Sequence, residues 1–111
     1  MKEFERLIEN SDIKVIFKLG QNANENHELI DYADKNDWWF HLQDYPSGHC
    51  IVERTDIEKE DIIFASTLVK ENSKYKNFKK VSICYTQVKN IKKTRIAGEV
   101  KILIKPKTII L

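Results

Sequence analysis

Both tryptophans and two of the three histidines of this chain lie in one short segment, together with a carboxylate. If that segment is a β-strand, Asp37, Trp39 and His41 share one face, because alternate side chains of a strand point the same way. Trp38 and Phe40 then point to the opposite face, into a core. Packing of a small core does not require this combination of side chains, whereas a binding site does.

An aromatic ring on an exposed strand face suits the stacking of an unpaired nucleic-acid base, while nearby lysines hold the phosphates. Trp39 and His41 are the candidates for stacking, which contributes about 1–3 kcal/mol per base. His49 follows a Pro-Ser-Gly turn and returns to the same segment. A structural alternative is that Asp37 accepts a hydrogen bond from His41 or His49 and fixes the hairpin, because a buried polar group needs a partner. The residues alone leave both interpretations open.

Metal binding and catalysis fit the same side chains less well. The available metal-binding atoms belong to Asp37, His41, His49 and Cys50. However, His49 and Cys50 are adjacent and point to opposite faces of a strand, and the usual zinc-binding spacings are missing. Ser47 is a candidate nucleophile near His49, although serine is common in turns for backbone reasons. We therefore expect no metal, no cofactor and no enzymatic activity.

Charge is distributed unevenly along the chain, although the formal net charge is only +2. Residues 1–69 hold 7 Lys or Arg against 15 Asp or Glu, whereas residues 70–111 hold 12 against 2, so the balances are −8 and +10. An electropositive C-terminal part is typical of a nucleic-acid binder, unless folding interleaves the two parts. The candidates for phosphate contact form two clusters, Lys74, Lys79 and Lys80, and Lys89, Lys92, Lys93 and Arg95.

Size and composition predict one globular domain over residues 1–111. A chain of this length buries about two-thirds of its unfolded surface, and 41% apolar with 32% charged residues excludes disordered and fibrous classes. No apolar run approaches the roughly 20 residues of a membrane span, and the first residues do not resemble a signal peptide. Cys50 and Cys84 lie in apolar runs, which predicts buried free thiols and a reducing, cytoplasmic location.

The hydrophobic pattern predicts an α+β fold, with an antiparallel or mixed sheet and helices packed mainly on one face. The expected helices cover residues 2–9, from Asn22 or Asn24 to about 33, and from 55 or 56 to about 72. The expected strands cover residues 13–19, 37–41, 49–53, 81–85, 99–104 and 108–111. The last two are expected to pair with each other around a turn at Lys105-Pro106-Lys107, and the basic tract before them is expected to be a connection.

The Asp-x-Trp-x-His pattern of Asp37, Trp39 and His41, followed by a short loop and His49, resembles the RNA-binding domain of NFACT proteins (NFACT-R). Further matches follow in the expected order over residues 13–111. They are Gly20-Gln21-Asn22-Ala23 with Asn26, Asn72-Ser73-Lys74, Tyr85-Thr86, Val88-Lys89-Asn90-Ile91-Lys92-Lys93 and Gly98-Glu99-Val100.

This resemblance implies a small stand-alone RNA-binding domain for structured RNA such as tRNA or rRNA, in translation or ribosome quality control. DNA binding remains an alternative, as does an adaptor that binds a protein through Trp38 or Tyr45. No membrane partner is expected. The residues expected to contact nucleic acid are Trp39, His41, His49, Lys74, Lys79, Lys80, Lys89, Lys92, Lys93 and Arg95.

Overall fold

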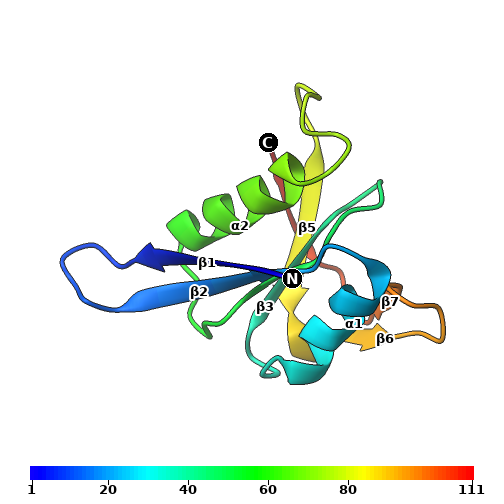
Figure 1. The fold of residues 1–111 in the computed structure, drawn as a ribbon, viewed down its shortest axis with the longest axis horizontal. Coiled ribbons are helices and arrows are strands. Elements are labelled where there is room, and N and C mark those ends of the chain that lie inside the picture. The colour runs from blue at the N-terminus through cyan, green and yellow to red at the C-terminus, as the bar shows by residue number, and fades with distance from the viewer.

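A six-stranded antiparallel sheet with the strand order β1-β2-β4-β3-β5-β8 forms the centre of the computed structural model, which describes all 111 residues (Figure 1). Its strands are β1 Lys2–Leu7, β2 Lys14–Leu19, β3 Trp38–Leu42, β4 Cys50–Val52, β5 Ser82–Gln87 and β8 Lys107–Ile110. A separate hairpin consists of β6 Ile91–Lys93 and β7 Val100–Ile102. The helices are α1 Ala23–Tyr32, α2 Lys59–Glu71 and a single 3-10 turn, η1 Val88–Asn90.

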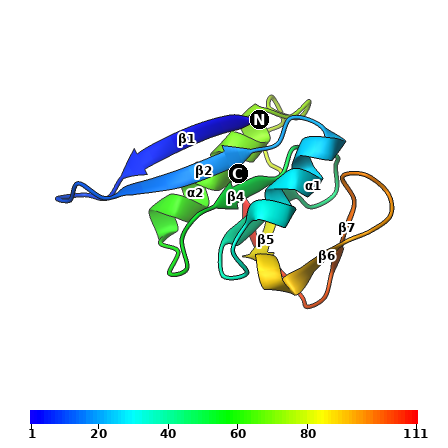
Figure 2. The same ribbon diagram turned by 60° about the horizontal axis from the view of Figure 1, so that its bottom comes forward.

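The sheet separates two hydrophobic cores. The α2-side core consists of Val15, Phe17, Leu19, Phe40, Leu42, Cys50, Val52, Ala65, Val69, Val81, Ile83 and Tyr85. The α1-side core lies beneath α1 and the β6–β7 hairpin and consists of Leu29, Trp39, Ile51, Cys84, Val88 and Ile91 (Figure 2). The α+β class and the antiparallel sheet are thus confirmed. Helices packed mainly on one face of the sheet were expected, but α1 and α2 lie on opposite faces. Both faces of β3 are therefore buried.

The N-terminal segment forms strand β1, and the helix expected over residues 2–9 is wrong. All six residues of β1 pair antiparallel with β2. The side chains of Phe4 and Arg6, two positions apart, are the partly buried ones in this strand, as strand alternation requires. The apolar spacing resembles that of a helix, but the free edge of β2 supplies backbone partners that a short isolated helix lacks.

The C-terminal strands also pair differently from the expected hairpin. Strand β7 pairs with β6, which lies in the basic tract expected to be only a connection, and β8 pairs with β5 at the sheet edge. The reason lies in the two cores. Val100 and Ile102 of β7 pack on the α1-side core, whereas Ile109 of β8 packs on the α2-side core. The two strands therefore serve opposite faces of the sheet and cannot remain paired.

Both expected long helices are present, and each is capped at its N-terminus by a hydrogen bond between residues three positions apart. The Asn22 side chain accepts a hydrogen bond from Glu25 N at 2.9 Å, which confirms Asn22 as the N-cap of α1. Helix α2 begins later than expected, after Glu58, whose backbone N–H donates to Asp61 Oδ2 at 3.0 Å. This capping interaction, rather than Thr55 or Asp56, sets the helix start.

The two cysteines are buried and unbonded to each other, as predicted. They belong to different cores, Cys50 to the α2-side core and Cys84 to the α1-side core. Burial raises the pKa of the Cys84 thiol to about 11, so it stays protonated at neutral pH. Neither helix combines the length and the apolar character needed to cross a membrane.

Candidate nucleic-acid interface

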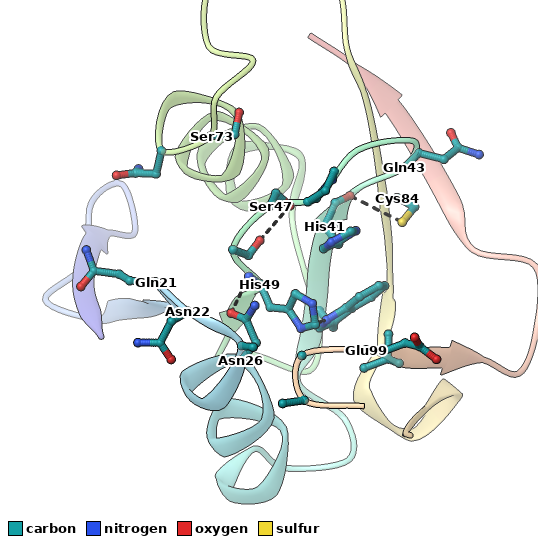
Figure 3. Close-up of a pocket in the computed structure, with 18 of the residues that line it drawn as sticks. Gln21, Asn22, Asn26, His41, Gln43, Ser47, His49, Ser73, Cys84 and Glu99 are labelled. Atoms are coloured by element: carbon teal, nitrogen blue, oxygen red, sulfur yellow. Dashed lines mark hydrogen bonds between the residues drawn. The ribbon is translucent and has the colours of Figure 1, made fainter. Parts of the chain in front are cut away.

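An open cleft of about 920 Å³ lies on the α1 side of the sheet, where six parts of the chain converge (Figure 3). Its walls come from the first turn of α1, strands β3 and β5, the β3–β4 turn, the segment after α2 and the β6–β7 hairpin. Four of the expected site residues line this cleft, namely Trp39, His41, His49 and Lys74. The tertiary fold thus brings together residues that are up to 35 positions apart in the sequence.

The cleft wall near α1 is built from backbone hydrogen bonds around His49. Its N–H donates to Asn26 Oδ1 at 3.0 Å, and its carbonyl accepts from Gly20 N at 2.9 Å. A Cβ at Gly20 would collide with the Asn26 side chain, and one at Gly48 would collide with the Gly20 carbonyl. The two glycines therefore permit the close approach of α1 and the β3–β4 turn. Asn26 is buried and was not among the expected site residues, although its segment belongs to the resemblance.

The three rings of the Asp-x-Trp-x-His segment and His49 form one compact cluster. The indole of Trp39 donates from Nε1 to Nδ1 of His49 at 3.1 Å, and both residues are 1% exposed. The His41 ring stacks on Trp39 with 5.7 Å between centroids and 4° between planes, and it meets His49 edge-on at 4.9 Å. Because Nδ1 of His49 accepts this hydrogen bond, the proton of the neutral ring resides on Nε2.

Asp37 is not the partner of these histidines, so that structural alternative is wrong. Its Oδ2 accepts a hydrogen bond from Asp34 N at 3.0 Å, in the turn that leads into β3. The hydrogen bond between Trp39 and His49 braces the hairpin instead. These two residues are ten positions apart and are connected by the β3–β4 turn. The reason is that Asp37 lies just before β3 begins, where the chain is still turning.

Burial changes the role that Trp39 can have. With 1% of its surface exposed it fills the α1-side core, and its ring offers no free face to a base. His41 is half-buried and lines the cleft, so part of its ring is accessible there. Desolvation by burial lowers the pKa of His41 below its ordinary value of 6.5, so the ring is neutral at pH 7 and offers hydrogen bonding rather than charge.

Protonation of His49 should destabilise the fold. Burial, with smaller contributions from His41 and His27, lowers the pKa of His49 from 6.5 to about 3. Between these pH values the unfolded chain binds a proton that the folded chain excludes, so stability falls as the pH falls through this range. We expect the free energy of unfolding to be about 2 kcal/mol lower at pH 5 than at pH 7. Urea denaturation at both pH values measures this difference.

His49→Gln is the matched control for this pH dependence. The Gln side chain can still accept a hydrogen bond from Trp39 but does not titrate. We expect this variant to lose most of the decline in stability between pH 7 and pH 5. An unchanged decline in the variant would show that another group is responsible.

Polar side chains at the ends of β3 and α2 serve local geometry. The Ser47 hydroxyl accepts from Leu42 N at 3.1 Å and donates to the Gly48 carbonyl at 3.0 Å, so it holds the turn. At the end of α2, Asn72 Nδ2 donates to the Leu68 carbonyl and Ser73 Oγ to the Lys70 carbonyl. These bonds give Ser47 a role in the β3–β4 turn and give Asn72 and Ser73 roles in capping the end of α2.

Of the expected basic residues only Lys74 lines the cleft, and the others lie in two segments that each contribute other residues to its lining or continue into residues that do. Lys74 lines the wall after α2, and Lys79 and Lys80 continue along the same exposed segment before β5. The second cluster lies on η1, β6 and the start of the β6–β7 loop, and it consists of Lys89, Lys92, Lys93 and Arg95. Lys92 and Lys101 lie opposite each other in the register of the β6–β7 hairpin, and both are exposed.

Folding keeps most of the charge asymmetry of the sequence. Six of the seven ion pairs lie wholly within residues 1–69, and only Lys93–Asp31 joins the two parts. The ion pairs of the acidic part are therefore mostly internal to it, and they leave most cations of residues 70–111 without a carboxylate partner. Six of the expected site cations are exposed and form no ion pair with a carboxylate, namely Lys74, Lys79, Lys80, Lys89, Lys92 and Arg95.

The third histidine, His27, holds the β6–β7 loop, which lines the cleft, and it was not among the expected site residues. Nε2 of His27, on α1, lies 2.9 Å from the carbonyl oxygen of Glu99 and ties the β6–β7 loop to the helix. Their separation of 72 positions hides this contact from the sequence.

Comparison with known proteins matches residues 4–102 to the family described as NFACT protein RNA binding domain. The Rqc2 homolog RqcH of Bacillus subtilis (strain 168) is 29% identical over 76 residues, covering 68% of this chain and 13% of that protein. Coiled-coil domain-containing protein 25 is 36% identical over 86 residues in Danio rerio, covering 68% of this chain and 40% of the relative. The Bos taurus protein of the same name is 35% identical over 95 residues, covering 77% of this chain and 44% of the relative.

Among solved structures, the C-terminal part of the fibronectin/fibrinogen-binding protein from Streptococcus suis has a TM-score of 0.84 and 25% identity. The match covers the whole of this chain and 45% of that chain. This chain therefore spans less than half the length of each of these relatives.

Proposed function

We propose that this chain, which belongs to the family of NFACT protein RNA binding domains, binds RNA at the cleft and along the cations on its two sides. The observation that supports this most directly is the position of the exposed cations without carboxylate partners, because ten of these thirteen lie in residues 70–111. Unpaired cations attract phosphates over distances of about a Debye length and release counterions on contact. Electrostatic attraction therefore supplies most of the binding free energy in this proposal.

The proposed ligand is a structured RNA, such as tRNA or ribosomal RNA. Cations on both sides of the cleft would hold two stretches of phosphate backbone, as a folded RNA presents them. Neutral His41 and the polar wall around Asn26 would meet the RNA between them by hydrogen bonding. A role in translation or ribosome quality control and a cytoplasmic location belong to the same proposal, as does the absence of catalysis.

Salt dependence tests the proposal. The logarithm of the association constant for tRNA should decrease linearly with the logarithm of the salt concentration, with a slope of about −0.7 to −0.9 per phosphate contact. For four contacts this is about a 50- to 150-fold decrease between 50 and 200 mM salt. Fluorescence anisotropy with tRNA, single-stranded RNA and duplex DNA measures it. A flat response, or tighter binding to an acidic protein, would contradict RNA binding, and a preference for duplex DNA would favour the DNA alternative.

Lys92→Ala combined with Lys93→Ala should weaken binding to different RNA sequences by the same factor, because phosphate contacts carry no sequence information. Stability should change by less than about 0.5 kcal/mol. Lys14→Ala combined with Lys59→Ala removes the same charge from exposed positions in the acidic part and serves as the matched control. Equal effects of the two double variants would mean that only net charge matters and that the β6–β7 hairpin makes no contact.

A further inference from the structure

Three aromatic rings from two separate segments form an exposed cluster at the end of the cleft opposite α1. Tyr45 comes from the β3–β4 turn, and Tyr75 and Phe78 come from the segment between α2 and β5. Tyr45 stacks on Tyr75 with 4.2 Å between ring centroids and 26° between planes. Phe78 contacts both rings edge-on, at 5.8 Å from Tyr45 and 5.2 Å from Tyr75.

Core packing and hydrogen bonds hold the cluster in place, while two of its rings remain exposed. Tyr75 is half-buried, packs on the α2-side core and lines the cleft, and its N–H donates to Ser73 Oγ at 3.1 Å. The Phe78 N–H donates to the Tyr75 carbonyl at 3.0 Å. Phe78 and Tyr45 nevertheless keep 46% and 38% of their surfaces exposed. Folding has already met the ordering cost of these exposed ring surfaces, so a ligand that contacts them does not have to meet it again.

The charges around the cluster suit a phosphate backbone. Four lysines lie within the same short segment as Tyr75 and Phe78, and all four are exposed, namely Lys74, Lys76, Lys79 and Lys80. None of them forms an ion pair with a carboxylate. The acidic residues next to the cluster in sequence are Asp44 and Glu71, so cations outnumber them two to one. An apolar protein partner would not require this excess of positive charge.

We infer that Tyr45, Tyr75 and Phe78 form a stacking platform for an unpaired base of a single-stranded RNA segment whose phosphates contact the surrounding lysines. This inference rests on the proposed RNA binding and assigns it a base-contacting surface. The platform takes the role that the sequence suggested for Trp39, whose ring is sealed in the core. Stacking on aromatic rings tolerates any base, so the site selects unpaired structure rather than sequence.

The test compares two ligands with equal charge. One is an oligoadenylate of about ten nucleotides, within the usual site size, and the other is an abasic oligonucleotide with the same number of phosphates. Tyr45→Leu combined with Phe78→Leu keeps apolar bulk but removes the two exposed rings, and it leaves the half-buried Tyr75 in place. We expect this variant to bind oligoadenylate about 5- to 150-fold more weakly for each stacked base, and to bind the abasic ligand as the wild-type protein does.

Two control variants separate stacking from charge and from folding. Tyr32→Leu removes an exposed ring, 86% accessible, from α1, and it should not change the affinity for either ligand. Lys79→Ala combined with Lys80→Ala should weaken both ligands by the same factor, because both carry the same phosphates. Melting temperatures of all variants, measured beside the affinities, identify any loss of affinity that is due to unfolding. If the double variant unfolds, the Tyr45→Leu single variant replaces it.

Equal loss of the base-bearing and abasic ligands in the Tyr45/Phe78 variant would overturn the inference. Unchanged affinity for both ligands would also overturn it, while salt-sensitive tRNA binding in the same experiment would leave the proposed function standing. If no RNA bound with a salt-dependent affinity, the proposed function and this inference would fall together.

Discussion

Replacing Trp39 with alanine is expected to lower the free energy of unfolding by about 3–5 kcal/mol. The indole fills the α1-side core and is 1% exposed, so its removal leaves a cavity. It also leaves the buried Nδ1 of His49 without the donor that now lies 3.1 Å away, which adds to the cost. Thermal denaturation should show a melting temperature more than about 10 °C below that of the wild-type protein.

Two further variants give this prediction its controls. Trp39→Phe keeps an aromatic ring in the core but removes the N–H donor, so its loss of stability should be clearly smaller than that of Trp39→Ala. Tyr32→Ala removes a ring that is almost fully exposed, and stability should change by less than about 0.5 kcal/mol. If folded Trp39→Phe protein bound RNA much more weakly than the wild-type protein, the indole would contact the ligand and our interpretation of its burial would be wrong.

Asp61→Ala is expected to destabilise the protein by about 3–5 kcal/mol. The Asp61 carboxylate has no exposed surface and pairs with two guanidinium groups, that of Arg6 on β1 and that of Arg54 at 2.8 Å. It also accepts the N–H of Glu58 and so caps α2. Its removal leaves the partly buried Arg6 without a carboxylate partner, and Arg54 keeps only its ion pair with Glu58. Urea denaturation measures the loss.

Glu60→Ala is the matched control, because this residue lies in the same turn of α2 but is exposed. Its effect should remain below about 0.5 kcal/mol. Asp61→Leu combined with Arg6→Met and Arg54→Met replaces the whole ionic group by apolar side chains of similar size, and it should cost much less than Asp61→Ala alone. A triple variant as unstable as Asp61→Ala would show that the ion pairs themselves stabilise the fold.

Several features of the site follow from local rules and were predictable from the sequence. Alternation in β3 correctly separates Trp39 from Phe40, because successive side chains of a strand point to opposite faces whatever the rest of the chain does. The cap at Asn22 depends on a contact three residues away, and the turn around Ser47 depends on its immediate neighbours. The α+β class follows from the same short-range periodicities.

Burial of Trp39 could not be predicted, because it depends on what covers that face of β3. Alternation shows which side chains share a face, but not whether a layer lies above it. Helix α1 and the β6–β7 hairpin supply that layer, and the hairpin comes about fifty residues after Trp39 in the chain. The same long-range packing excluded Asp37 from the histidine cluster and chose the indole of Trp39 as the partner of His49.

The sequence by itself determined the local elements, the family and the charge asymmetry, because propensity, capping and composition act over a few residues or need no structure at all. Only the tertiary structure decided that residues 2–7 form an edge strand, that β8 leaves β7 to pair with β5, and that Tyr45 meets Tyr75 and Phe78. The contacts of β8 with β5 and of Tyr45 with Tyr75 and Phe78 join segments that are far apart in the chain, whereas β1 pairs with the next strand. Their formation depends on which backbone edges and apolar faces remain unpaired once the rest of the sheet has formed.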